Sequence, residues 1–134
     1  MPADSPVRTI VDLLNGDYTV GVKTGTTGDS IITEDVGEDR VVRFMHIEDA
    51  VDALLRGEVD AIVYDDQAAG SIIARQDGIV SLQTAYAIEA YALAVPKSNP
   101  ALLEQVNRIM GEMEADGTLQ AIIDEYTARA AAEE

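Results

Sequence analysis

The sequence predicts an α/β fold, a three-layer α/β/α arrangement with a mostly parallel sheet. Two observations indicate this fold class. Segments typical of strands alternate with segments of helical periodicity over the first two thirds of the chain. Residues 59–64 (VDAIVY) are also continuously apolar apart from Asp60, a pattern typical of a strand buried in a parallel sheet. Helices on both faces follow from the alternation, because each crossover between parallel strands passes over one face.

The first elements of this alternation occupy residues 7–34. A short helix is expected at residues 7–15, because Gly16 follows as a stop signal. The β-branched and aromatic segment 18–22 (YTVGV) predicts the first strand. The polar, glycine-bearing segment 24–29 predicts a turn, and a short helix is expected at residues 30–34.

An acidic loop at residues 35–40 is expected to lead into a second strand at residues 41–45 (VVRFM). The clearest helix of the first half is predicted at residues 47–56, and Gly57 lies at its C-cap position. Four apolar residues recur there at helical spacing: Ala50, Val51, Leu54 and Leu55.

The third strand is expected at residues 59–64, with Asp65 and Asp66 at its carboxyl end. A helix at residues 67–76 follows, Gly78 interrupts it, and residues 79–82 predict a fourth strand.

The last third of the sequence has a different pattern. Residues 91–95 (YALAV) predict one more strand, which Pro96 stops. Asn99 followed by Pro100 marks a helix start, Gly117 closes that helix, and Thr118 caps a second one whose tail, residues 128–134, is expected to fray. The first of these helices has one apolar face, made of Leu102, Leu103, Val106, Ile109, Met110 and Met113.

These patterns divide the chain into two parts. Residues 1–88 form the α/β core, and residues 89–134 supply the return strand and the two C-terminal helices. The apolar face of the second part needs a partner surface. It is expected either to pack on the core or to be exchanged with another chain in a homodimer.

The composition excludes several classes of function. Acidic residues outnumber basic ones by 25 to 9, which gives a net charge of −16. Nucleic acid and anionic membrane surfaces are therefore poor partners, because binding them requires Lys and Arg to neutralise phosphates. The chain has no cysteine and a single histidine, His46, so thiolate chemistry and a histidine-based metal cluster are excluded. A carboxylate site for a hard cation stays open, but no metal or cofactor is predicted.

The same composition bears on location. No run of about 18 apolar residues occurs, so no membrane span is predicted. The first residues, MPADSP, lack the apolar stretch of a secretory signal. The sequence is therefore expected to be either cytoplasmic or a mature or excised piece of an exported protein.

The turn from Lys23 to Ser30 is the first candidate site. By the strand assignment it lies at the carboxyl edge of the sheet, where ligands of open α/β folds bind. Amides at the start of the next helix attract an anion, and the hydroxyls of Thr26 and Thr27 add donors. The alternative is plain helix capping by these threonines, which is common in such positions.

Asp65 is the second candidate, because it ends the third strand at the same edge. Its carboxylate would suit an ammonium group, although an exposed acid without a role is the default in so acidic a chain. An acid and a donor-rich turn at neighbouring strand ends would hold both ends of a zwitterion. A shared acid/base site with Asp66 is disfavoured, since adjacent strand residues point to opposite faces. His46 is interpreted as structural, because no nucleophile pattern accompanies it.

Three segments resemble one known family. The segment YTVGVKTGTTG from Tyr18 is similar to the opening of the second lobe in family 3 solute-binding proteins, which have the type II periplasmic-binding-protein fold and serve ABC transporters of polar amino acids. The segment AVDALLRGEVDAIVYDD from Ala50 resembles that family's helix, glycine, strand and aspartate. Segments from Tyr91 to Leu103 and from Asp116 to Ile123 resemble its return strand and terminal helices.

The resemblance implies a ligand-binding role rather than catalysis. Thr26 and the amide of Thr27 would hold the α-carboxylate of an amino acid, and Asp65 would hold its α-ammonium group. Lys23 and Tyr64 would lie near the pocket and contact the side chain. Gly25 belongs to the same ligand-binding turn.

Relative to the family pattern, the sequence is expected to lack the first lobe, which in the family supplies the aromatic wall and the arginine that clamps the ligand. Weak or incomplete amino-acid binding is therefore expected, and a permease partner is implied only for the full-length family. Two alternatives stay open: an assembly module that binds no ligand, and a relative of the cyclohexadienyl dehydratases that share the fold. The family resemblance implies a periplasmic or extracellular location.

Overall fold

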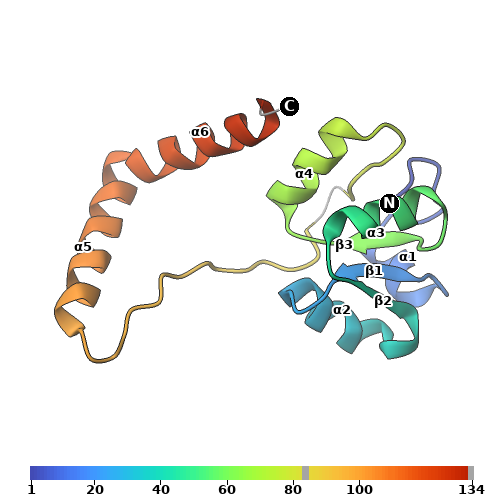
Figure 1. Ribbon diagram of the computed structural model, residues 1–134, viewed down its shortest axis with the longest axis horizontal. Coiled ribbons are helices and arrows are strands. Elements are labelled where there is room, and N and C mark those ends of the chain that lie inside the picture. Colours follow the sequence, from blue (N-terminus) through green and yellow to red (C-terminus); the bar gives the residue numbers. More distant parts are fainter. Residues whose placement is uncertain (83–84, 133–134) are drawn as a thin grey trace. The chain divides into compact units, whose positions relative to one another are not determined.

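The computed structural model describes residues 1–82 and 85–132 of the chain (Figure 1). It divides into two compact units, Met1–Ala87 and Ile88–Glu134. Among the described residues, no helix is long and apolar enough to cross a membrane.

A parallel sheet of three strands forms the centre of the first unit. Strands β1 (Val20–Lys23), β2 (Val41–Phe44) and β3 (Ala61–Val63) lie in the order β2-β1-β3, and β1 pairs in parallel with both neighbours. The prediction of a parallel sheet built from these three segments is therefore confirmed.

Helices cover both faces of this sheet, as predicted (Figure 1). Val20 and Val22 on β1 point to one face, where they are fully buried with side chains from helices α1 (Ile10–Asn15) and α2 (Thr27–Val36). This cluster contains Val7, Leu13, Val20, Val22, Ile32 and Ala61.

On the other face, helices α3 (Ile47–Leu55) and α4 (Asp66–Arg75) pack on the sheet. The buried cluster here contains Val51, Ala53, Leu54, Val59 and Ile79, with Ile72 and Ile73 of α4 against it. The two clusters lie on opposite sides of the strands because side chains alternate along a strand. The three-layer architecture is thus confirmed.

Capping explains where two helices begin. The side chain of Thr9 accepts from the amide of Asp12, and the Asp12 carboxylate accepts from the amide of Thr9 at 2.8 Å, so α1 starts at Ile10 and not at residue 7. Helix α2 starts at Thr27, before residue 30, because Thr26 caps it. The expected acidic loop was wrong in part: α2 runs to Val36, and a 3-10 turn, η1 (Glu38–Arg40), follows.

Two predicted strands are absent from the described residues. Residues 79–82 form a single antiparallel bridge between Ile79 and Pro2, in which the amide of Val80 donates to the carbonyl of Met1 at 2.9 Å. Residues 91–95 have no regular structure, and Tyr91 and Leu93 are exposed. A strand needs a neighbour to satisfy its amides and carbonyls, and residues 91–95 belong to no strand of the described sheet, which consists of β1, β2 and β3.

The second unit consists of helices α5 (Pro100–Asp116) and α6 (Thr118–Ala132), which pack against each other. Asn99 caps α5 and Pro100 occupies its first turn, as predicted. Gly117 separates the helices with φ of 82°, a left-handed conformation that favours glycine. Helix α6 extends through Ala132, so the expected fraying from residue 128 was wrong for residues 128–132; residues 133 and 134 lie outside the described residues.

Candidate functional site

The strand order places a candidate site between the carboxyl ends of β1 and β3. The chain passes from β1 to β2 on one side and then crosses to β3 on the other side of β1. In open α/β sheets, ligands bind at such a point, where successive connections leave in opposite directions. The turns after β1 and β3 both start at this edge, because Val22 aligns with Val63 in the parallel register.

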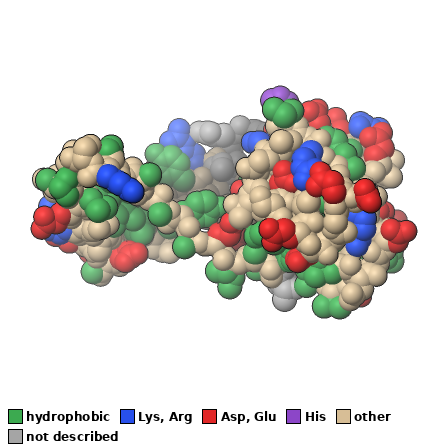
Figure 2. Space-filling view, turned by 90° about the horizontal axis from the view of Figure 1, so that it is seen from below, with side chains coloured by type: hydrophobic (Ala, Val, Ile, Leu, Met, Phe, Trp, Pro, Cys, Tyr) green, Lys and Arg blue, Asp and Glu red, His purple; other side chains and the backbone are tan. Residues whose placement is uncertain are grey.

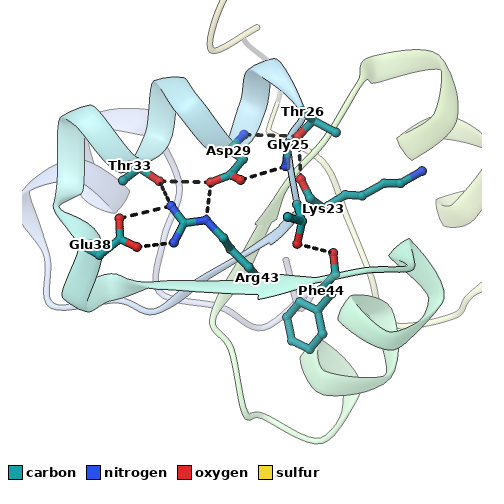
Figure 3. A network of polar contacts seen from close by, with 9 residues as sticks. Lys23, Gly25, Thr26, Asp29, Thr33, Glu38, Arg43 and Phe44 are labelled. Atoms are coloured by element: carbon teal, nitrogen blue, oxygen red, sulfur yellow. Dashed lines mark hydrogen bonds and ion pairs between the residues drawn. The ribbon is translucent and has the colours of Figure 1, made fainter.

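The β1–α2 turn is held together by Thr26. Its hydroxyl donates to the carbonyl oxygen of Lys23 at 2.9 Å and accepts from the amide of Asp29 at 3.2 Å (Figure 3). The threonine therefore acts as a helix cap, which is the alternative that the sequence left open for it. Gly25 has φ of 76°, a conformation in which a side chain would be strained.

The amides of Thr27 and Gly28 are the part of this turn that remains available. They lie in the first turn of α2, where an α-helix provides no acceptor of its own. No other described residue accepts a hydrogen bond from either amide. The positive end of the α2 dipole is therefore open to an anion at this point.

Asp29 is the main feature of the turn that the sequence analysis missed. It is buried, and its Oδ2 accepts from the amide of Gly25 at 3.0 Å. Its Oδ1 accepts from the Nε of Arg43 at 2.8 Å and from the hydroxyl of Thr33 at 3.3 Å (Figure 3). The hydrogen bond from Gly25 lowers the pKa of the Asp29 carboxyl below its ordinary value; burial opposes this and Arg43 reinforces it. The Thr-x-x-Asp spacing of residues 26 and 29 was the available signal.

The prediction that Asp65 ends the third strand was wrong. Strand β3 stops at Val63, and Asp65 is the N-cap residue of α4, with its carbonyl accepting from the amide of Ala69 at 2.8 Å. Its side chain is exposed and makes no capping hydrogen bond to the helix. Asp66 is the first residue of α4, so the argument that the two acids point to opposite faces of a strand was wrong.

The turns after β1 and β3 come close together at Gly28. A Cβ built on Gly28 would lie 3.1 Å from the Cγ1 of Val63 and 3.4 Å from its carbonyl oxygen. The start of α2 therefore lies directly against the end of β3, where Tyr64 and Asp65 follow. Tyr64 and Lys23 are half-buried. The Lys23 side chain extends away from the Asp29–Arg43 pair in Figure 3.

His46 lies outside the turns after β1 and β3. His46 is the N-cap residue of α3 and makes no capping hydrogen bond through its side chain. Within residues 1–82 and 85–132, no group of three His, Asp or Glu side chains is arranged to hold a metal ion.

Comparison with known proteins connects this geometry to one family. The family model for bacterial extracellular solute-binding proteins, family 3, matches residues 30–129. The glutamine-binding protein of an ABC transporter from Bacillus subtilis is 26% identical over 122 residues, which are 91% of this chain and 44% of that protein. The chain thus spans about half the length, or less, of the curated relatives it matches.

Solved structures show the same partial coverage. A mutant of the protein ArgBP from T. maritima superposes with a TM-score of 0.78 at 33% identity, covering 95% of this chain and 55% of that one. Domain 2 of the same protein, solved by itself, has a TM-score of 0.54 at 34% identity and covers 63% of this chain and 91% of that domain. The chain is therefore similar to about half of a larger binding protein.

Proposed function

The chain belongs to the bacterial extracellular solute-binding proteins of family 3, and from this premise we propose that it is an amino-acid-binding lobe. The relatives include glutamine-, cystine- and arginine-binding proteins, which supports a role in amino-acid transport. The binding residues, the affinity and the partners given below are part of the same proposal.

The proposed ligand lies at the carboxyl edge of β1 and β3. Its α-carboxylate accepts hydrogen bonds from the amides of Thr27 and Gly28 at the start of α2. Its α-ammonium group pairs with Asp65, and the ligand side chain contacts Lys23 and Tyr64. Thr26 and Gly25 shape the turn that presents the amides.

A single observation carries this proposal: the start of α2 lies directly against the end of β3, at the contact between Gly28 and Val63. This contact brings the open amides of α2 and the N-cap acid of α4 to neighbouring strand ends. A free amino acid carries one negative and one positive group two bonds apart on its α-carbon. Such a ligand suits a site with donors on one side and a carboxylate on the other.

Binding by this chain is expected to be weak, roughly millimolar or worse, which corresponds to about −4 kcal/mol. A small ligand at an open edge keeps much of its surface in water, whereas tight sites enclose most of it. Isothermal calorimetry and NMR titration with L-glutamine, L-arginine and L-cystine test this. Micromolar binding would contradict the expectation and would require a second surface that closes the site.

Variants at the two turns test the residues. Asp65→Ala is expected to abolish the shifts caused by an amino acid while the fold persists. Thr26→Val is expected to weaken binding, because it removes the hydroxyl that caps α2 and bonds to Lys23. Asp66→Ala is the matched control, since it removes an equal charge from the next residue. Loss of binding in Asp66→Ala but not in Asp65→Ala would reverse the assignment of the acid.

Two further proposals follow from the family. The chain is a binding protein without catalytic activity, as the family's description as solute-binding proteins supports. It acts outside the cytoplasmic membrane and delivers its ligand to an ABC transporter permease, as the transporter context of its relatives supports. NMR of the ligand itself tests the absence of catalysis. Hydrolysis or dehydration of a bound ligand would contradict it.

A specific observation favours a second role for the other unit, which is self-association. Packing of α5 on α6 leaves Leu102, Leu103 and Ile109 of α5 at 40 to 45% exposure, and Ile122 and Ile123 of α6 are each 38% exposed. Hydrophobic side chains are visible on the surface of this unit at the left of Figure 2. Several exposed large apolar side chains on one small unit are typical of an interaction site.

Sedimentation of the full chain, and of the chain ending at Ala87, tests this second role. A homodimer formed through α5 and α6 is expected to disappear in the shorter chain and to strengthen with salt, which screens the net charge of −16. A full chain that is monomeric at all salt concentrations would contradict it.

A further inference from the structure

Asp29 and Arg43 lie behind the turn that carries the proposed carboxylate site. The Asp29 carboxylate uses Oδ2 to hold the amide of Gly25 at 3.0 Å and Oδ1 to hold Arg43 Nε at 2.8 Å (Figure 3). Arg43 stands on β2, the strand next to β1 on the side away from β3. The turn is therefore tied to a neighbouring strand by a charged pair and not only by the cap at Thr26.

The position of Asp29 creates an electrostatic problem for an anionic ligand. Its carboxylate lies in the first turn of α2, close to the open amides of Thr27 and Gly28. A negative charge there satisfies the helix dipole and repels a second negative charge. An amino-acid carboxylate would therefore compete with Asp29 unless the charge of Asp29 were compensated.

Arg43 supplies this compensation from the opposite side. Its guanidinium also contacts the Glu38 carboxylate, with Nη2 at 3.1 Å from Oε2, and donates to the Thr33 hydroxyl at 3.0 Å. These contacts fix the planar group in one orientation, with its Nε toward Asp29. Glu38 is exposed, whereas Asp29 is buried, so the pair with Asp29 is the better shielded from water.

We propose that Arg43 is a positioning residue for the amino-acid site: it holds and neutralises Asp29, which fixes the Gly25 turn and leaves the positive end of α2 to the ligand carboxylate. The inference makes two claims. The effect of Arg43 on ligand binding rests on the proposed function, whereas the coupling of Arg43 to the Gly25 turn through Asp29 concerns the protein alone.

The coupling is tested by NMR of the full chain, following the amide of Gly25 as a function of pH. Arg43 is the charged group that contacts the Asp29 carboxylate, and Glu38 is the second carboxylate that contacts Arg43. In the wild type, the Gly25 shift is expected to follow a carboxyl titration with a midpoint below the ordinary range of Asp. Arg43→Met is expected to raise this midpoint, and Arg43→Lys to restore part of the difference.

Arg56→Met is the matched control for the loss of a positive charge, since Arg56 forms an exposed pair with Glu58 in the turn that follows α3. It is expected to leave the Gly25 midpoint unchanged. An unchanged midpoint in Arg43→Met overturns the inference. Direct detection of the Asp29 carboxyl carbon in the same samples shows whether the Gly25 amide follows this acid.

The role of Arg43 in ligand binding is tested by titrating the same variants with L-glutamine and L-arginine, and with their C-terminal amides, which keep the α-ammonium group. Arg43→Met is expected to weaken binding of the acids about two- to fivefold relative to Arg56→Met, the range typical of one charge at a helix end. Binding of the amides, which lack the carboxylate charge, is expected to change little. The double variant Asp29→Asn with Arg43→Met is expected to recover most of the loss.

The outcomes separate the two proposals. Equal weakening of acids and amides, or no recovery in the double variant, overturns the electrostatic role of Arg43 and leaves it as a purely structural tie. A wild-type chain that responds to none of the probes overturns the proposed function and the effect of Arg43 on ligand binding together. The Gly25 titration still tests whether Arg43 is coupled to the Gly25 turn through Asp29.

Discussion

The two units of this chain carry similar apolar patterns but use them differently. Every buried hydrophobic side chain among the described residues lies in the Met1–Ala87 unit, where most of them form the two clusters on the faces of the sheet. In the Ile88–Glu134 unit, α5 has an apolar face and no buried residue. An amphipathic pattern thus predicts a helix, whereas a core also requires a second surface of matching shape.

The sheet accounts for this difference. Three short strands give the first unit two faces, and each face is covered by helices that are close to it along the chain. The described helices of the second unit are α5 and α6, which pack against each other. A pair of helices buries only the side of each helix that contacts the other. The remaining apolar side chains of α5 and α6 have no face to cover within their own unit.

The largest expected contrast between the units comes from cutting back one isoleucine in each. Ile32→Ala in α2 removes a fully buried side chain and is expected to lower the free energy of unfolding by about 2–5 kcal/mol. Ile109→Ala in α5 removes a side chain that is 45% exposed, and it is expected to cost less than about 1 kcal/mol. Urea denaturation followed by circular dichroism, with NMR signals assigned to each unit, measures both.

This contrast has a clear counter-result. A large loss of stability in Ile109→Ala would show that the α5 face is buried in solution, on the first unit or on a second chain. Repeating the measurement at two protein concentrations separates these, because stability from a second chain depends on concentration.

The helix caps give a smaller contrast of the same kind. Thr9→Ala breaks the capping box of α1 and is expected to lower the stability of the first unit by about 0.5–2 kcal/mol. Asn99→Ala breaks the cap of α5, where the Asn side chain accepts from the amide of Leu102 at 3.1 Å. Because α5 lacks a buried face, this second change is expected to reduce helicity near Pro100 and to leave the first unit unchanged. Hydrogen exchange at the two helix starts measures both effects.

Local signals predicted most of the fold. In the part of the chain that the structure describes, the three parallel strands and the six α-helices arise from segments whose periodicity and caps were readable, because these depend on neighbouring residues. The strands expected at residues 79–82 and 91–95 were wrong for the opposite reason. A strand also depends on a distant partner, and residues 79 and 80 bond to the N-terminal residues Pro2 and Met1 and not to the sheet.

The candidate site was predictable in outline and not in detail. Sequence order placed the turns after β1 and β3 at one edge, since parallel strands share their carboxyl ends. The Asp29–Arg43 pair joins residues 14 positions apart on different elements. No local pattern indicates such a pair in a chain with 25 acidic residues, where each Arg has many possible partners. The N-cap role of Asp65 depended on where β3 stops, and boundaries are set by tertiary packing.

Tyr86, near the end of the first unit, has both an apolar contact and a hydrogen bond with that unit. Its ring packs on the buried cluster that contains Val7 and Ile32, and its hydroxyl donates to the Asp35 carboxylate of α2. Tyr86→Phe is expected to lower the stability of the first unit by about 0.5–1.5 kcal/mol through loss of this hydrogen bond. Tyr126→Phe in α6 is the control, because it keeps the ring that Arg129 contacts. Thermal unfolding of the two variants measures the difference.

The Tyr86 contact also predicts a dependence on alkaline pH. Burial, and then the hydrogen bond to Asp35, raises the pKa of the Tyr86 phenol above its ordinary value of 10.0. Its stabilising contribution is therefore complete below pH 10 and is lost as the pH rises above that value. The wild type and Tyr86→Phe are expected to converge in stability at high pH; a constant difference between them would contradict the contact.

The smallest expected effect concerns acid, and it compares one carboxylate from each unit. The hydrogen bond from the Gly25 amide lowers the pKa of Asp29, and hydrogen bonds from Thr118 lower the pKa of Asp116. A lowered pKa in the folded state gives stability that is present above the ordinary carboxyl range and is lost as the pH falls through the folded value. Asp29 ties α2 to β2, so its protonation loosens the first unit, whereas exposed Asp116 affects only the α5–α6 turn. Asp29→Asn is therefore expected to flatten the loss of first-unit stability between about pH 5 and pH 2, and Asp116→Asn is expected to leave that curve unchanged. Urea denaturation at a series of pH values measures both curves; identical acid curves for Asp29→Asn and the wild type would show that the buried pair contributes nothing to the fold.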